Sequence, residues 1–95
     1  MYVIIVYDVE QKRVNKVMKF LRRFLIWVQN SVFEGETTEA KFKEIQIGLK
    51  KLIKQDKDSV VFYQMETEKN FRRTVLGVDK NPVDTMIWKN CLFAI

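Results

Sequence analysis

A continuous apolar run near the start of the chain places the strongest constraint on its fold. Residues Tyr2 to Tyr7 are all aliphatic or aromatic, and Asp8 follows at once. The run is too short for a helix core, so it predicts a strand with both faces buried. A chain of 95 residues supports one domain with one modest core. The remaining elements must therefore cover both sides of this strand.

Two segments with helical spacing supply part of that cover. In the first, five apolar residues fall on one side of the helix, because a helix advances by about 100° per residue, and this side is expected to be buried. These residues are Val14, Val17, Met18, Leu21 and Leu25. The second has Thr37 or Thr38 as its expected N-cap and should stop near Gln55. Its apolar stripe consists of Phe42, Ile45, Leu49, Leu52 and Ile53.

Short strands are expected around these helices. Alternating side chains predict a second strand from Trp27 to Glu34, ended or bulged by Gly35. A third is expected from Val60 to Met65 and a fourth from Phe71 to Leu76. The order βαβαββ predicts an α+β, ferredoxin-like sheet with both helices on one face.

The opposite face of that sheet would be left without helices. A second copy of the chain is the simplest cover, so we expect a homodimer through this face. Val83 to Trp88 should form a short final strand that pairs with a sheet edge of its own subunit or of the partner. We expect one domain over residues 1–88 and a C-terminal extension over residues 89–95.

The positive charge of the chain is concentrated in its first helical segment. Six basic residues and no acid lie there: Lys12, Arg13, Lys16, Lys19, Arg22 and Arg23. The net charge is +5, so the other basic residues are nearly cancelled by the 12 acidic ones. One interpretation is an ordinary solvated helix face. However, like charges on one short helix repel each other, and a polyanion would relieve that repulsion. The phosphate backbone of a duplex fits better than base-specific recognition, since no base-reading motif is present.

The candidate catalytic and metal-binding residue is Asp8. The chain has no histidine and one cysteine, Cys91, which excludes histidine-based catalysis, the usual zinc sites and an internal disulfide. Any metal must then be a hard cation such as Mg²⁺ or Mn²⁺, held by oxygen. One carboxylate is a weak site, but a twofold axis near the strand end would pair two Asp8 side chains. The alternatives are that Asp8 caps the first helix or pairs with Arg13.

Several further residues have two interpretations each. Ser31 and Phe33 would share a strand face with Trp27 and could contact nucleic acid, or they could be core or dimer contacts. Arg72 and Arg73 could extend the basic surface or protect a strand edge. Glu34 and Glu36 could add metal ligands or belong to a turn.

These features together resemble the Cas-two (Cas2) family, the smaller CRISPR adaptation protein, also known as a CRISPR-associated endoribonuclease. The resemblance runs from Met1 to about Trp88. It is carried by Tyr7-Asp8-Val9, by the basic residues of the first helix, and above all by the stretch QNSVFEGE at residues 29–36. Trp27 and Val28 stand where some members have an arginine, and residues 89–95 pass the usual end.

The resemblance implies a ferredoxin-like homodimer that holds Mg²⁺ or Mn²⁺ between its paired Asp8 residues and cleaves phosphodiesters in some members. It also implies a non-catalytic role, in which the protein bridges dimers of the larger adaptation integrase and helps the integrase to capture double-stranded DNA. The alternative is a toxin-like, metal-dependent endoribonuclease that acts on mRNA outside CRISPR. Single-stranded RNA is a second candidate ligand beside double-stranded DNA. No apolar run reaches the roughly 20 residues of a membrane span and no secretion leader is evident, so a cytoplasmic location is expected.

Overall fold

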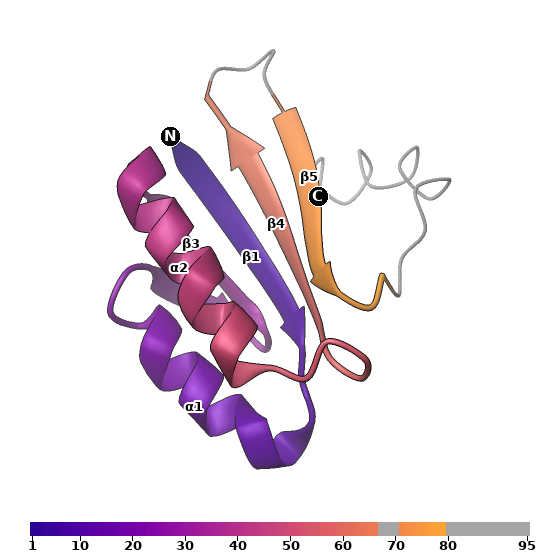
Figure 1. Cartoon of the computed structure of the whole chain (residues 1–95). Helices are drawn as coiled ribbons and strands as arrows, with labels where there is room; N and C mark the ends of the chain where they lie inside the picture. The colour runs from indigo at the N-terminus through magenta and orange to yellow at the C-terminus, as the bar shows by residue number, and fades with distance from the viewer. Residues whose placement is uncertain (67–70, 80–95) are drawn as a thin grey trace.

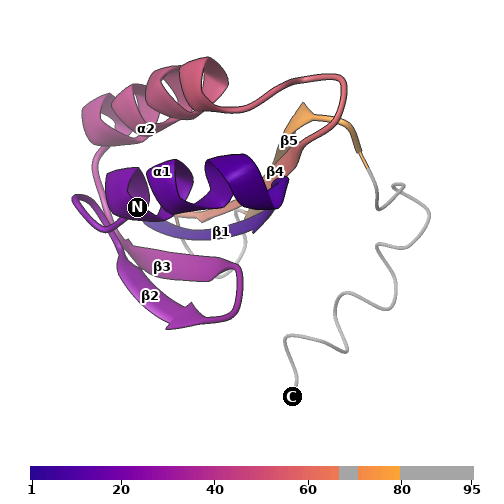
Figure 2. The ribbon, with the colours of Figure 1, turned by 90° about the horizontal axis from the view of Figure 1, so that it is seen from below.

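A single antiparallel sheet with two helices on one side forms the body of the molecule (Figures 1 and 2). The computed structural model describes residues 1–66 and 71–79. Its elements are β1 (Tyr2–Asp8), α1 (Gln11–Leu21), β2 (Ile26–Gln29), β3 (Val32–Glu36), α2 (Glu39–Leu52), β4 (Ser59–Met65) and β5 (Phe71–Gly77). The strand order is β2-β3-β1-β4-β5. This confirms the α+β, ferredoxin-like class.

A hairpin replaces the single second strand that the sequence predicts. The segment from Trp27 to Glu34 divides into β2 and β3, which pair with each other around Asn30 and Ser31. Asn30 has φ of 44°, in the left-handed region that asparagine tolerates better than most residues. The Trp27 indole N–H donates to the Asn30 carbonyl at 2.9 Å and closes the turn. Side-chain alternation runs on through such a short turn, so periodicity alone did not reveal it.

Both predicted helical stripes lie in the core. Val17, Leu21 and Leu25 are buried, as are Phe42, Ile45, Leu49 and Ile53 of the second stripe. The remaining members, Val14, Met18 and Leu52, are partly buried against the same cluster. Thr38 is the N-cap of α2, and its hydroxyl accepts from the Lys41 amide. Gly48 lets the two helices approach, because a Cβ there would collide with the Phe20 ring.

The two faces of β1 have different surroundings. Val3, Ile5 and Tyr7 are buried beneath the helices, whereas Tyr2, Ile4 and Val6 on the other face are only partly buried. The sequence predicts that both faces of this strand are buried. In the single chain, only the face toward the helices is fully buried. The hypotheses on Val83 to Trp88 and on residues 89–95 fall outside the described residues. Within the described part of the chain, no helix is long and apolar enough to cross a membrane.

Candidate nucleic-acid interface and metal position

The basic side chains predicted for the first helical segment mostly face solvent. Lys12, Lys16 and Lys19 are exposed on α1. Arg22 and Arg23 are also exposed, but they lie in the turn that follows the end of α1 at Leu21. Five of the six cations are therefore accessible. Lys12, Lys16 and Lys19 form a basic ridge on α1, because the apolar stripe of this helix fixes which side faces the sheet.

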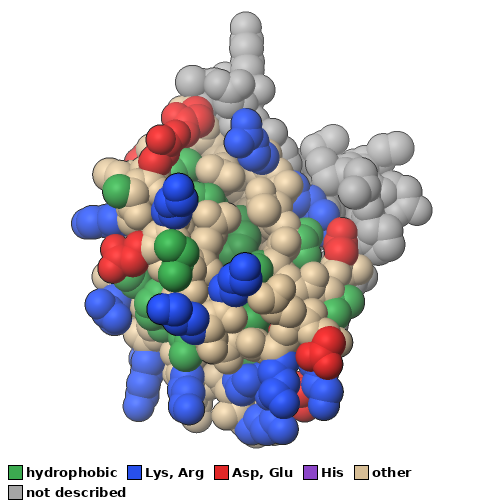
Figure 3. Space-filling model, viewed as in Figure 1, with side chains coloured by type: hydrophobic (Ala, Val, Ile, Leu, Met, Phe, Trp, Pro, Cys, Tyr) green, Lys and Arg blue, Asp and Glu red, His purple; other side chains and the backbone are tan. Residues whose placement is uncertain are grey.

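Helix α2 adds basic residues that the sequence interpretation did not include in this surface. Lys41, Lys43, Lys50 and Lys51 are all exposed. Both helices cover the same face of the sheet, so basic side chains of both lie on one side of the molecule (Figure 3). The signal that could have revealed this was the surplus of lysine over glutamate in α2. Glu39 and Glu44 offset part of that surplus but not all of it.

Arg13 differs from the other five cations because it is bound within the protein. Its Nε donates to Asp58 Oδ2 at 2.7 Å, and one guanidinium NH₂ donates to Asp58 Oδ1 at 2.9 Å. The same NH₂ donates to Glu10 Oε1 at 2.6 Å. Its side chain is 12% exposed. Arg13 therefore joins two loops of the fold and presents little of its guanidinium to a ligand.

Asp58 is the buried partner in this pair. Its side chain is fully buried and also accepts from the backbone N–H groups of Glu10 at 3.1 Å and Lys54 at 2.8 Å. The Arg13 guanidinium, followed by these two amides, holds the pKa of the Asp58 carboxyl well below its ordinary value of 3.8, against the opposing effect of burial. The carboxylate thereby links the β1–α1 connection to the α2–β4 connection.

Asp8 is exposed at the end of β1, where its backbone pairs with Ser59 of β4. The N-cap position of α1 is occupied by Glu10, and Arg13 donates hydrogen bonds to Glu10 and Asp58. Side chains alternate along a strand, so Asp8 shares a face with Tyr2, Ile4 and Val6. This is the face that the helices leave uncovered.

A single chain offers Asp8 few companions for holding a cation. Residues 1–66 and 71–79 contain no cluster of three or more carboxylate or cysteine side chains suited to a metal ion. Glu34 and Glu36 pair with Ile4 and Tyr2, toward the other end of β1. A strand rises about 3.3 Å per residue, which puts Glu36 roughly 20 Å from Asp8. Asp8 is thus a hard oxygen ligand that fits Mg²⁺ or Mn²⁺ only as half of a site.

The stretch around β3 contributes Phe33 to the core and fastens its turn to β1. Phe33 is fully buried, with its ring centroid 6.0 Å from that of Tyr7. The Ser31 carbonyl accepts from the Tyr7 amide at 3.0 Å, so the hairpin turn is fastened to β1. Of the two interpretations for Phe33, a core role is what the fold shows. Ser31 is partly exposed at the turn.

The two arginines of β5 are placed differently from each other. Arg72 is exposed, while Arg73 donates to both carboxylate oxygens of Asp79 at 2.8 and 3.2 Å. The Arg73 side chain is largely buried. Arg72 is therefore the member of this pair that adds accessible positive charge.

The fold and these side chains define a small ferredoxin-like protein with a basic helical face. The family model for CRISPR associated protein Cas2 matches residues 1–73. CRISPR-associated endoribonuclease Cas2 of Methanocaldococcus jannaschii is 54% identical over 87 residues, which cover 92% of this chain and 76% of that protein. The protein of the same name from Thermococcus kodakarensis is also 54% identical, over 92% of this chain and all of its own length.

Solved structures agree with these matches. A crystal structure of Cas2 has 51% identity and a TM-score of 0.68, covering 87% of this chain and 93% of its own. Streptococcus pyogenes Cas2 has 35% identity and a TM-score of 0.65, covering 72% of this chain and 89% of its own. The chain belongs to the Cas2 family of CRISPR-associated proteins.

The buried Asp58 carboxylate makes a pH-dependent contribution to stability. Its folded-state pKa is depressed, so its contribution is complete above the unfolded value of 3.8 and is lost as pH falls below it. We expect Asp58→Ala to lower the free energy of unfolding at neutral pH by about 3 kcal/mol. It should also flatten the decline of stability between about pH 5 and pH 2. Urea unfolding at a series of pH values and fixed protein concentration measures both effects.

Asp56→Ala is the matched control, because Asp56 is exposed in the same turn. It should change the unfolding free energy by less than about 0.5 kcal/mol. Equal effects of the two substitutions would show that the buried pair does not stabilise this junction.

Proposed function

We propose that this chain is a CRISPR adaptation protein: a homodimeric adaptor that binds duplex DNA and bridges dimers of the larger adaptation integrase. The observation that carries the proposal is the basic face formed by α1, α2 and the turn after α1. Mixed charges would be expected on a helix face that is merely solvated. Helix α1, however, contains no acidic residue to offset its lysines. Duplex phosphates supply the missing negative charge.

Dimerisation through the uncovered sheet face is the second part of the proposal. Tyr2, Ile4 and Val6 leave apolar surface there, and a second copy of the sheet would remove it from water. Asp8 shares this face, so a twofold axis near the end of β1 would bring two Asp8 carboxylates together. The half-site of one chain then becomes a site with two oxygen ligands.

A paired Asp8 site would hold Mg²⁺ or Mn²⁺ and support phosphodiester cleavage. When bound, the ion would polarise a phosphate oxygen and lower the pKa of a coordinated water. The role of the protein would be to hold the two carboxylates in place. In each subunit, the Arg13–Asp58 pair fixes the connection that follows Asp8. The relatives named as endoribonucleases support RNA as an alternative substrate. We propose single-stranded RNA in that case, either within CRISPR or in a toxin-like role on mRNA.

Introducing a charge into the uncovered face should dissociate the dimer. We expect Ile4→Asp to shift the protein from dimer to monomer at micromolar concentration, because an unpaired carboxylate would be buried in the interface. Sedimentation velocity measures the change. Ile47→Asp is the matched control, since Ile47 is exposed on α2 and should leave the dimer intact. A well-folded wild-type monomer would contradict both the dimer and the paired Asp8 site.

Duplex DNA binding should depend steeply on salt and little on sequence. If about five phosphates are contacted, log K against log salt should have a slope of about −4 to −5. Lys16→Glu should weaken binding and flatten this slope, as measured by fluorescence anisotropy. Lys57→Glu makes the same charge change outside both helices, in the exposed α2–β4 turn near Glu10, and should have a smaller effect. Binding that is insensitive to salt would contradict the proposed interface.

Asp8→Asn should separate cleavage from assembly. We expect it to abolish any Mg²⁺-dependent or Mn²⁺-dependent cleavage, while duplex binding and complex formation with the integrase persist. Cleavage assays on RNA and DNA, with and without a chelator, and a spacer-acquisition assay measure the two roles. If Asp8→Asn forms the complex but blocks acquisition, cleavage is the physiological activity. Full cleavage by this variant would place the reaction elsewhere.

A further inference from the structure

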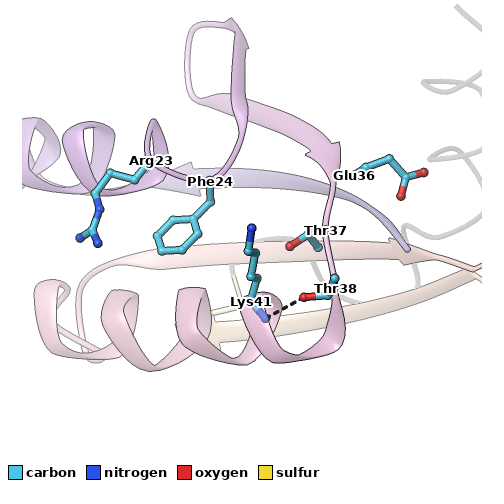
Figure 4. A pocket seen from close by; sticks show the side chains of 6 residues that line it. All are labelled: Arg23, Phe24, Glu36, Thr37, Thr38 and Lys41. Carbon is cyan, nitrogen blue, oxygen red and sulfur yellow. Dashed lines mark hydrogen bonds between the residues drawn. The ribbon is translucent and has the colours of Figure 1, made fainter.

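A polar cavity lies between the turn after α1 and the start of α2, far from Asp8. Its volume is about 310 Å³, and its lining consists of Arg23, Phe24, Glu36, Thr37, Thr38 and Lys41 (Figure 4). The Thr37 amide donates to the Met1 carbonyl at 2.8 Å, which places the cavity beside the start of β1. Asp8 is at the opposite end of that strand. The cavity is therefore a separate feature from the candidate metal position.

The side chain of Thr37 carries an unsatisfied polar atom in this cavity. Its Oγ1 is buried, and it has no hydrogen-bond partner within the described part of the chain. Figure 4 shows this hydroxyl and the Lys41 ammonium pointing toward each other across the cavity. The neighbouring Thr38 hydroxyl is already engaged, since it accepts from the Lys41 amide at 3.2 Å. A buried hydroxyl is stabilised by a partner, so an incoming oxygen acceptor would complete this arrangement.

The charges around the cavity select an anion. Lys41 lies on one side of the Phe24 ring and Arg23 on the other (Figure 4). The Arg23 guanidinium is 5.4 Å from the centroid of that ring, a cation–π contact that restricts where it lies. The one acid in the lining, Glu36, is directed away from Lys41 and pairs with the N-terminal ammonium at 3.3 Å. The cavity thus presents two cations and a free hydroxyl to its ligand.

We propose that this cavity binds a backbone phosphate of the nucleic acid, with Lys41 and Thr37 as the donors and Arg23 as a flanking contact. The proposal rests on the proposed function, because it adds a defined phosphate position to the basic face. Arg23 continues the exposed basic ridge of α1, so a strand that follows this ridge reaches the cavity at its end. A phosphate oxygen accepts from both a hydroxyl and an ammonium, and its negative charge, unlike a neutral water, also offsets the charges of Lys41 and Arg23.

Thr37→Val is the decisive variant, because it removes the hydroxyl without changing the charge and nearly preserves the shape. We expect it to raise the Kd for a short DNA duplex by about tenfold or more at fixed salt, the loss of a hydrogen bond to a charged group. The melting temperature should stay the same or rise, since an unsatisfied buried hydroxyl is removed. Lys41→Gln should weaken duplex binding more than Lys51→Gln, which removes the same charge from α2 outside the cavity.

A titration with inorganic phosphate, followed by NMR, tests the cavity independently of nucleic acid. The amide signals of Thr37 and Lys41 should shift in the wild-type protein and not in Thr37→Val. If Thr37→Val binds duplex normally and Lys41→Gln matches Lys51→Gln, the cavity proposal is overturned while the proposed function stands. If phosphate shifts the amides but no duplex binds the wild-type protein, the assignment to nucleic acid is overturned together with the proposed function.

Discussion

The position of β1 at the centre of the sheet is the constraint on which the rest of the structure depends. β1 pairs with β3 on one side and β4 on the other, and its inner residues Val3 and Ile5 anchor the core beneath both helices. A strand with apolar side chains on both faces needs cover on both. The two helices cover only one face of the sheet. Ile4, Val6 and the exposed Asp8 therefore lie together on the opposite face. The proposed dimer interface and the candidate metal ligand are therefore linked by strand geometry.

The distribution of cations shows how one residue type can serve two purposes. Arg13 is held against the buried Asp58, where its planar guanidinium makes several charge-assisted hydrogen bonds and fixes two loops. The neighbouring Lys12 and Lys16 remain in solvent, where their mutual repulsion is unrelieved within α1. Fold stability and the proposed attraction of phosphate thus fall to different members of one basic cluster, according to which side of the helix each occupies.

Much of the fold could be predicted from local pattern, and the errors have physical causes. The stripes of α1 and α2, the Thr38 cap and the course of β4 followed from periodicity and capping chemistry. The Asn30–Ser31 turn was missed because a two-residue turn leaves alternation nearly unbroken. The engagement of Arg13 was also missed, because its partner Asp58 lies 45 positions away in the chain. The additional lysines of α2 became part of one surface only when both helices were placed on the same face.

The sequence by itself determined the class of fold, the amphipathic helices, the family and the local surplus of positive charge. Each of these follows from the pattern of residues that lie close together in the chain. Only the tertiary structure decided which cations are accessible, that Phe33 is core, and that Thr37 Oγ1 and Lys41 face a common cavity. Those outcomes depend on contacts between segments far apart in the chain, and burial is a property of the packed whole. A residue's type limits the chemistry available to it, but its neighbours in space decide which part of that chemistry is used.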